Sequence, residues 1–163
     1  MIKTKTLVFM TIIMIALTGC GKVEQERLTV YSFSGENEQI TISNGIIVLN
    51  GTEEIFSGGD LKATNDFFTD ITSYSTTFYT MSDSEKDVIL SNSVVDMTGG
   101  TVNVSGDLGQ VSGDSIISRI KIDDTSELNN TLYFELTTKD KSGKESVYQL
   151  QMSLTEITKN ANN

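Results

Sequence analysis

Residues 131–154, TLYFELTTKDKSGKESVYQLQMSL, decide the fold class of this chain. Apolar and polar side chains alternate through residues 131–138, as in a strand with one buried face. A polar loop follows, in which Gly143 is free to adopt a positive φ. Alternation then resumes over residues 146–154, with Tyr148, Leu150, Met152 and Leu154 on one face. The stretch predicts an antiparallel hairpin with one face on a core and the other in water.

The same period of two recurs upstream, between turns marked by glycine. We expect strands at residues 28–33, 40–49, 54–57, 66–81, 88–90, 94–95, 101–104 and 115–123. Asn44-Gly45 is predicted to be a type I′ hairpin turn that splits the second of these, and Asn50-Gly51 a further turn. The stretch 66–81 is one long strand or two joined by a bend. A single helical turn at residues 82–87 is the one helical feature expected.

Short strands at this spacing, without an amphipathic helix, predict an all-β fold. We expect an antiparallel two-sheet sandwich, immunoglobulin-like in architecture. A small lipocalin-like barrel is the alternative. Cys20 is the only cysteine, so no disulfide can form within the chain, and packing and backbone hydrogen bonds must stabilise the domain.

Composition excludes several classes of function. The chain has no histidine, which removes Ser-His-Asp and Cys-His catalysis and most zinc sites. It also has no tryptophan, the residue most used in sugar-binding platforms and interface hot spots. Without Lys3 and Lys5, the chain has ten basic and 22 acidic residues, which gives a net charge of −12. Such a charge repels nucleic acid. We therefore expect a protein that is not an enzyme, needs no cofactor and binds no nucleic acid.

The first twenty residues have the three parts of a secretory signal. Lys3 and Lys5 precede an apolar run at residues 7–17, which is too short to span a bilayer. Leu17-Thr18-Gly19-Cys20 ends the run and resembles the lipobox of bacterial lipoprotein precursors. The resemblance implies cleavage before Cys20, lipid on its thiol and an extracytoplasmic protein anchored to the cell membrane.

This resemblance sets the expected organisation of the chain. Residues 1–19 are a signal peptide, 20–27 a lipidated cysteine with a polar tether, 28–158 one β-domain and 159–163 a frayed tail. No aspartate follows Cys20, and the general character of the chain favours a host with one membrane, of the Gram-positive type. The segment Phe33-Ser34-Gly35-Glu36 is similar to one in small uncharacterised lipoproteins of Firmicutes, which implies no activity.

Two groups of residues are candidates for a functional site. The first gathers aromatic side chains that could form a contact patch: Phe67, Phe68, Tyr74, Phe78 and Tyr79. Alternation places Phe68, Tyr74 and Phe78 on one face and Phe67 and Tyr79 on the other. The second is the acidic group Asp123, Asp124 and Glu127, a weak candidate for binding a metal ion in a chain for which we expect no metal site.

These observations favour a non-catalytic lipoprotein whose β-domain binds a protein, a peptide or an envelope component. Two alternatives stay open. One is a small extracellular hydrolase that uses paired carboxylates, which needs two acids in a cleft. The other is a cup that binds a lipid or another small molecule, which needs a sheet closed around a cavity.

Overall fold

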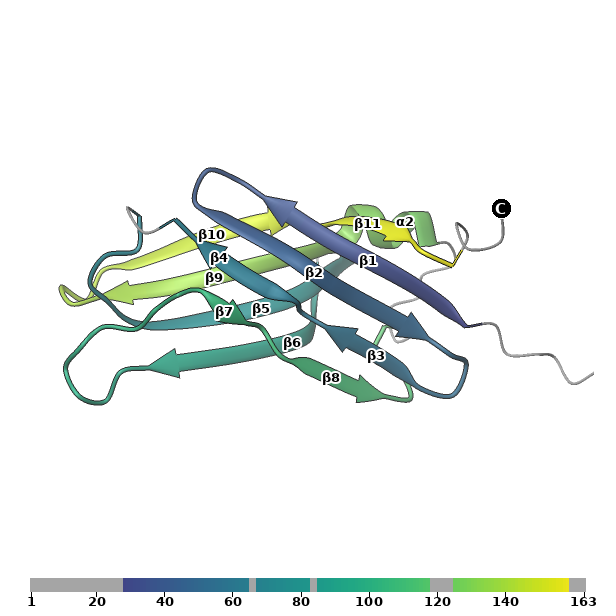
Figure 1. The fold of residues 1–163 in the computed structure, drawn as a ribbon, viewed down its shortest axis with the longest axis horizontal. Coiled ribbons are helices and arrows are strands. Elements are labelled where there is room, and N and C mark those ends of the chain that lie inside the picture. The colour runs from purple at the N-terminus through teal and green to yellow at the C-terminus, as the bar shows by residue number, and fades with distance from the viewer. Residues whose placement is uncertain (1–27, 65–66, 83–84, 118–124, 159–163) are drawn as a thin grey trace, which may run out of the picture.

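A computed structural model describes residues 28–64, 67–82, 85–117 and 125–158, which form two layered β-sheets and one short helix (Figure 1). The seven-stranded sheet contains β1 (Thr29–Glu36), β2 (Ile40–Leu49), β3 (Glu54–Ser57), β4 (Asp60–Ala63), β7 (Gly106–Asp107), β8 (Gln110–Gly113) and β11 (Ser153–Glu156). The four-stranded sheet contains β5 (Ile71–Ser82), β6 (Glu85–Val95), β9 (Leu132–Asp140) and β10 (Glu145–Gln151). The helix α2 (Thr125–Thr131) leads into β9.

All strand pairs are antiparallel, and neither sheet closes on itself. The larger sheet has the order β11-β1-β2-β3-β8. In addition, β4 pairs with β2, and β7 pairs with β4. The smaller sheet has the order β10-β9-β5-β6. The predicted antiparallel sandwich is therefore confirmed, and the described strands do not form the alternative closed barrel.

The predicted C-terminal hairpin is present as β9 and β10, with Phe134 opposite Leu150 and Leu136 opposite Tyr148. Gly143 in its loop has a φ of 84°, as expected. The second strand, predicted to run to residue 154, ends at Gln151. Buried Met152 then carries the chain into the other sheet, where β11 pairs with β1. Alternation continues across this crossing because both sheets face the same core.

The prediction of a hairpin turn at Asn44-Gly45 is wrong, since β2 runs through both residues. Asn44 has a φ of 59° and is the extra residue of a β-bulge opposite β1. The register moves from Phe33 opposite Gly45 to Gly35 opposite Ile42. A type I′ turn needs positive φ values, and this bulge places Asn44 at one, so the same residue pair suits either structure.

The bulge is also where β2 changes partners. Its first half pairs with β4 and its second half with β3. Gly59, with a φ of 72°, makes the short link between these two strands against the backbone of the bulge. Asn44 Nδ2 donates a hydrogen bond of 2.8 Å to Asp60 Oδ2 across the join. The strand β2 thus pairs with two short strands, β4 along its first half and β3 along its second.

Several further predictions differ from the structure. The strands expected at 88–90 and 94–95 are one strand, β6, because β5 pairs with it over its whole length. The helical turn expected at 82–87 is instead the end of the β5–β6 hairpin, with Ser82 opposite Glu85 and residues 83–84 outside the described residues. Residues 101–104 are not a strand, and α2 was not expected. Most of the strand expected at 115–123 lies outside the described residues.

Four phenylalanines occupy the centre of the sandwich. Phe33 and Phe56 come from the larger sheet and Phe78 and Phe134 from the smaller one. Each is at most 2 % exposed, and neighbouring ring centroids lie 5.0–5.6 Å apart. Rings at such spacings and tilts interact favourably beyond the area they bury. The interior between the sheets is therefore a packed aromatic core.

Glu54 is a buried acidic side chain at the start of β3. Its Oε2 accepts hydrogen bonds from the amides of Ile116 at 2.7 Å and Ile117 at 2.6 Å. These contacts join the chain that follows β8 to the larger sheet. A carboxylate that accepts backbone amides is compensated for its burial.

Thr80 offers a direct test of core polarity. Its side chain is fully buried on β5, and its hydroxyl has no hydrogen-bond partner among the described residues. Because a buried unpaired hydroxyl costs free energy, Thr80→Val is expected to raise the free energy of unfolding by about 1 kcal/mol in urea denaturation. Thr137→Val, on the outer face of the neighbouring strand β9, is the control and should change stability by less than about 0.5 kcal/mol. A loss of stability in Thr80→Val would show that the hydroxyl is paired.

Candidate binding surface

The five predicted aromatic residues do not form one exposed patch. Phe78 lies in the core, and Phe68 and Tyr74 are half-buried against it. Phe68 also packs on Tyr148, with ring centroids 5.0 Å apart. Phe67 is 49 % exposed, whereas Tyr79 is only 4 % exposed although it lies on the outer face of β5. Exposed aromatic surface in this group is thus limited to Phe67 and the edges of its neighbours.

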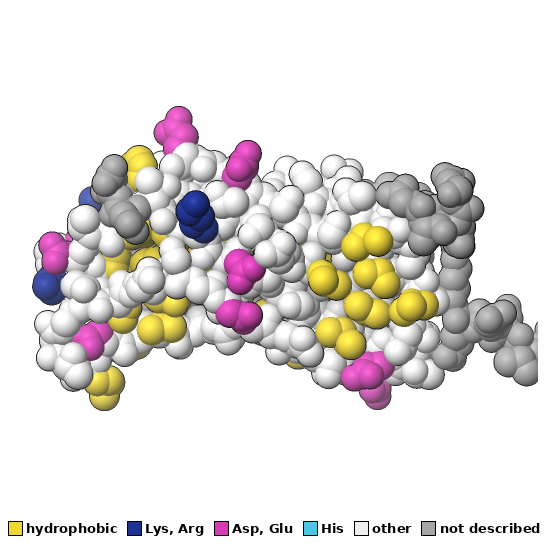
Figure 2. Space-filling view, viewed as in Figure 1, with side chains coloured by type: hydrophobic (Ala, Val, Ile, Leu, Met, Phe, Trp, Pro, Cys, Tyr) yellow, Lys and Arg dark blue, Asp and Glu magenta, His cyan; other side chains and the backbone are white. Residues whose placement is uncertain are grey.

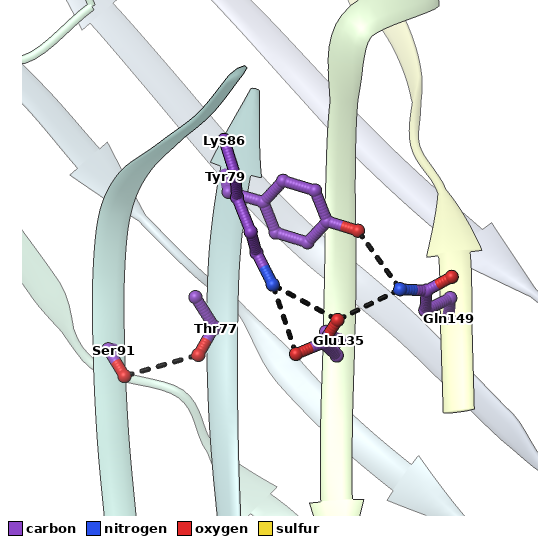
Figure 3. A network of polar contacts seen from close by, with 6 residues as sticks. All are labelled: Thr77, Tyr79, Lys86, Ser91, Glu135 and Gln149. Carbon is purple, nitrogen blue, oxygen red and sulfur yellow. Dashed lines mark hydrogen bonds and ion pairs between the residues drawn. The ribbon is translucent and has the colours of Figure 1, made fainter. Parts of the chain in front are cut away.

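Tyr79 is covered by a polar network on the outer face of the four-stranded sheet (Figure 3). Its ring stacks on Tyr133 with centroids 5.7 Å apart, and Lys86 Nζ lies 4.0 Å from its centroid. Lys86 Nζ also donates to both carboxylate oxygens of Glu135 at 3.0 Å. Gln149 Nε2 donates to Glu135 at 2.8 Å and to the Tyr79 hydroxyl at 3.3 Å. The network joins all four strands of the sheet.

The electrostatics of this network suit a structural role. The hydrogen bond from Gln149, together with the Lys86 ammonium, lowers the pKa of Glu135 below its ordinary value. Burial, reinforced by the negative charge of Glu135, raises the pKa of Tyr79. Both shifts keep the carboxylate charged and the phenol neutral at pH 7. A general acid needs a carboxyl with a raised pKa, and Glu135 is shifted in the opposite direction.

The network predicts a contribution to acid stability. Because the folded pKa of Glu135 is lowered, its stabilisation is present above its unfolded pKa and is lost as pH falls through the folded pKa. Glu135→Gln should therefore lose less stability than the wild type between pH 7 and pH 3 in urea denaturation. Glu145→Gln, at an exposed glutamate on β10, is the control and should follow the wild type. Equal slopes for Glu135→Gln and the wild type would contradict the prediction.

The strand β6 has an open side. It pairs with β5 along one side, and no described strand pairs with the other. Residues 88–95, VILSNSVV, carry no charge, and Val88, Val94 and Val95 are exposed. Sequence reasoning missed this edge because it divided β6 into two short strands. The uncharged run of eight residues was the available signal for one continuous strand.

A hollow of about 310 Å³ opens between this edge and the link from β7 to β8. Its lining includes Tyr74, Thr76, Asn92, Val94, Val104 and Leu108. Asn92 Nδ2 donates a 2.5 Å hydrogen bond to the carbonyl of Leu108, which ties the two sheets together here. The sandwich is therefore incompletely filled along the edge of β6.

An aliphatic patch lies on the outer face of the seven-stranded sheet, on the right in Figure 2. The register places Val30, Val48 and Ile55 in one cross-strand row, with Ile46 in the next. Leu28 and Ile157, both exposed, flank this patch where β1 begins. This aliphatic patch lies beside the first described residues.

The remaining candidate residues fall largely outside the described part of the chain. Cys20, Asp123 and Asp124 lie outside it, and so does the side chain of Glu127 on α2. Within the described residues, no group of three or more acidic or cysteine side chains could hold a metal ion. No helix among these residues is long and apolar enough to cross a membrane.

The fold and its surface define an antiparallel β-sandwich with a long open edge strand and an aliphatic outer patch. No protein-family model, curated protein or solved structure matches the chain.

Proposed function

We propose that this chain is an extracytoplasmic lipoprotein, anchored to the cell membrane through Cys20, whose β-sandwich binds a protein, a peptide or an envelope component without catalysis. The motif Leu17-Thr18-Gly19-Cys20 carries the anchoring part, since it stands at the end of a short apolar run. The first described strand begins at Thr29, and the polar residues between Cys20 and this strand suit a short tether. A lipid anchor close to a folded domain would hold that domain near the membrane surface.

The surface of the sandwich supports the binding part. The centre of the sandwich is filled by the four core phenylalanines, which favours recognition on the outside over an internal lipid cup. The open edge of β6 and the aliphatic patch both expose apolar side chains. Natural sheets usually cover or charge such features, so their exposure favours partners that cover them.

Metabolic labelling tests the anchor. In a Gram-positive host fed an alkyne-bearing palmitate, the wild-type chain should incorporate the label and sediment with membranes. Cys20→Ser should lose essentially all label and leave the membrane fraction. The matched control carries Cys20→Ser with Ser142→Cys, which places a thiol in the exposed β9–β10 loop. Label on that control, or undiminished label on Cys20→Ser, would overturn the proposed anchor.

A further inference from the structure

We propose that the open side of β6 binds an extended polypeptide segment, which adds a fifth strand to the four-stranded sheet. This inference rests on the binding part of the proposed function and is independent of the lipid anchor. In such recognition the backbone hydrogen bonds supply affinity, and the pockets for alternate side chains supply specificity. The edge, the hollow and the surrounding charge each bear on the partner.

The edge itself is long and uncharged. β6 has 11 residues, whereas the edge strands β8 and β11 have four each and β10 has seven. Proteins commonly protect edges with charges or with very short strands. Residues 88–95 have neither protection, although a bulge interrupts the pairing with β5 near Val88. No described strand pairs with the backbone donors and acceptors on the open side of this run, which suits the addition of another strand.

The hollow beside the edge determines the kind of side chain that fits. Asn92 and Val94 face the interior in register with Thr76 and Tyr74, and all four line the hollow. A strand added to β6 would direct every second side chain toward this space. About 310 Å³ suits a few small apolar side chains, such as valine or alanine. The segment should therefore alternate small apolar residues with polar ones.

Charge determines the ends of the segment. Glu85 and Asp87 are exposed at the start of β6, and Asp107 lines the hollow near its other end. Lys86, the basic residue on this strand, is held by Glu135 on the outer face. With ten basic and 22 acidic residues after the signal, the chain as a whole favours cationic partners. We therefore assign a segment with basic residues at its ends.

A second copy of the chain fits this edge less well. An antiparallel copy of β6 that pairs the uncharged run with itself sets Asp87 opposite Asp96 of the other copy. Directly opposed like charges destabilise a strand pair. Hydrogen bonds from Thr98 also lower the pKa of Asp96, so this carboxylate is charged at pH 7. The charge pattern thus favours a basic partner over self-association.

A defined peptide tests the proposal on the full chain purified in detergent, whether or not Cys20 carries lipid. The probe is a synthetic ten-residue peptide that alternates threonine and valine and has lysine at both ends. We expect saturable binding, with new hydrogen-exchange protection of alternate amides in residues 88–95. The same peptide with glutamate at both ends should bind at least about tenfold more weakly at low salt. A peptide with N-methylated central amides should not bind.

Two matched variants locate the binding. Val94→Lys places a cation at the hollow and should weaken binding of the lysine-ended peptide at least about tenfold. Val147→Lys, at a valine 59 % exposed on the opposite edge strand β10, should change it less than about twofold. Both sites are at least 39 % exposed, so both variants should keep the far-ultraviolet circular dichroism of the wild type.

Several results would overturn the proposal. Protection of residues 88–95 in the free monomer would show that the chain covers its own edge. Protection that appears only in a dimer, seen by analytical ultracentrifugation, would assign the edge to a second copy. Equal affinity for both end charges, or equal losses in the two lysine variants, would also overturn it. Absence of palmitate label from the wild-type chain, with intact peptide binding, would overturn the proposed lipid anchor but not the proposed strand addition.

Discussion

Phe78→Ala is expected to lower the free energy of unfolding by about 3–5 kcal/mol. The ring is 1 % exposed and contacts Phe33, Phe56 and Phe134, with centroids 5.6, 5.1 and 5.0 Å away. Truncation loses the transfer free energy of the ring and leaves a cavity between two sheets that are hydrogen-bonded along their lengths. Neighbouring side chains can relax only in part, because each is fixed on its own strand.

Urea denaturation followed by far-ultraviolet circular dichroism measures this loss, since the chain has no tryptophan. Phe67→Ala is the control, because the Phe67 side chain is 49 % exposed and should cost less than about 1 kcal/mol. The slope of free energy against urea should stay unchanged in both variants. If Phe78→Ala alone fails to fold, Phe78→Leu gives a smaller and measurable loss. Equal losses in Phe67→Ala and Phe78→Ala would show that Phe78 is not central to the core.

Alternation correctly predicted which side chains face the core and which face outward where a strand is regular. Tyr74 and Phe78 face the core and Tyr79 faces outward, as alternation along residues 66–81 predicts. Alternation cannot show that an outward side chain is also covered. Tyr79 is buried because Lys86, Tyr133 and Gln149 lie around it, and these residues come from three other strands. Coverage of this kind depends on strand order, which a local pattern does not contain.

The same limit applies to the candidate binding surface. The uncharged run in β6 is visible in the sequence, but its exposure depends on β6 being the last strand of its sheet. Likewise, alternation predicted one strand through Met152, because its side chain keeps the phase of Leu150 while the backbone changes sheets. The sequence therefore predicted the two-sheet class and the facing of most strands. Strand order and edges required the long-range pairings.

The Asn44-Gly45 pair shows most clearly that a local pattern does not contain the long-range pairings. A hairpin turn would require a positive φ at both residues, whereas Gly45 is not among the glycines with positive φ. Its lack of a side chain serves packing instead. A Cβ built on Gly45 would collide with the ring of Phe33, which lies directly over it from β1. Gly45→Ala is therefore expected to cost about 3 kcal/mol, at the upper end of overpacking effects.

A double-mutant cycle separates this clash from a general effect of glycine replacement. Gly106→Ala is the control, because nothing lies within 4 Å of its added Cβ and stability should change by less than about 1 kcal/mol. Phe33→Leu shortens the side chain over Gly45 and should recover at least about 1 kcal/mol of the Gly45→Ala loss in the double variant. Additive losses would place the cause in the backbone of the bulge. Recovery would show that the loss in Gly45→Ala comes from the ring of Phe33, which occupies the space above Gly45.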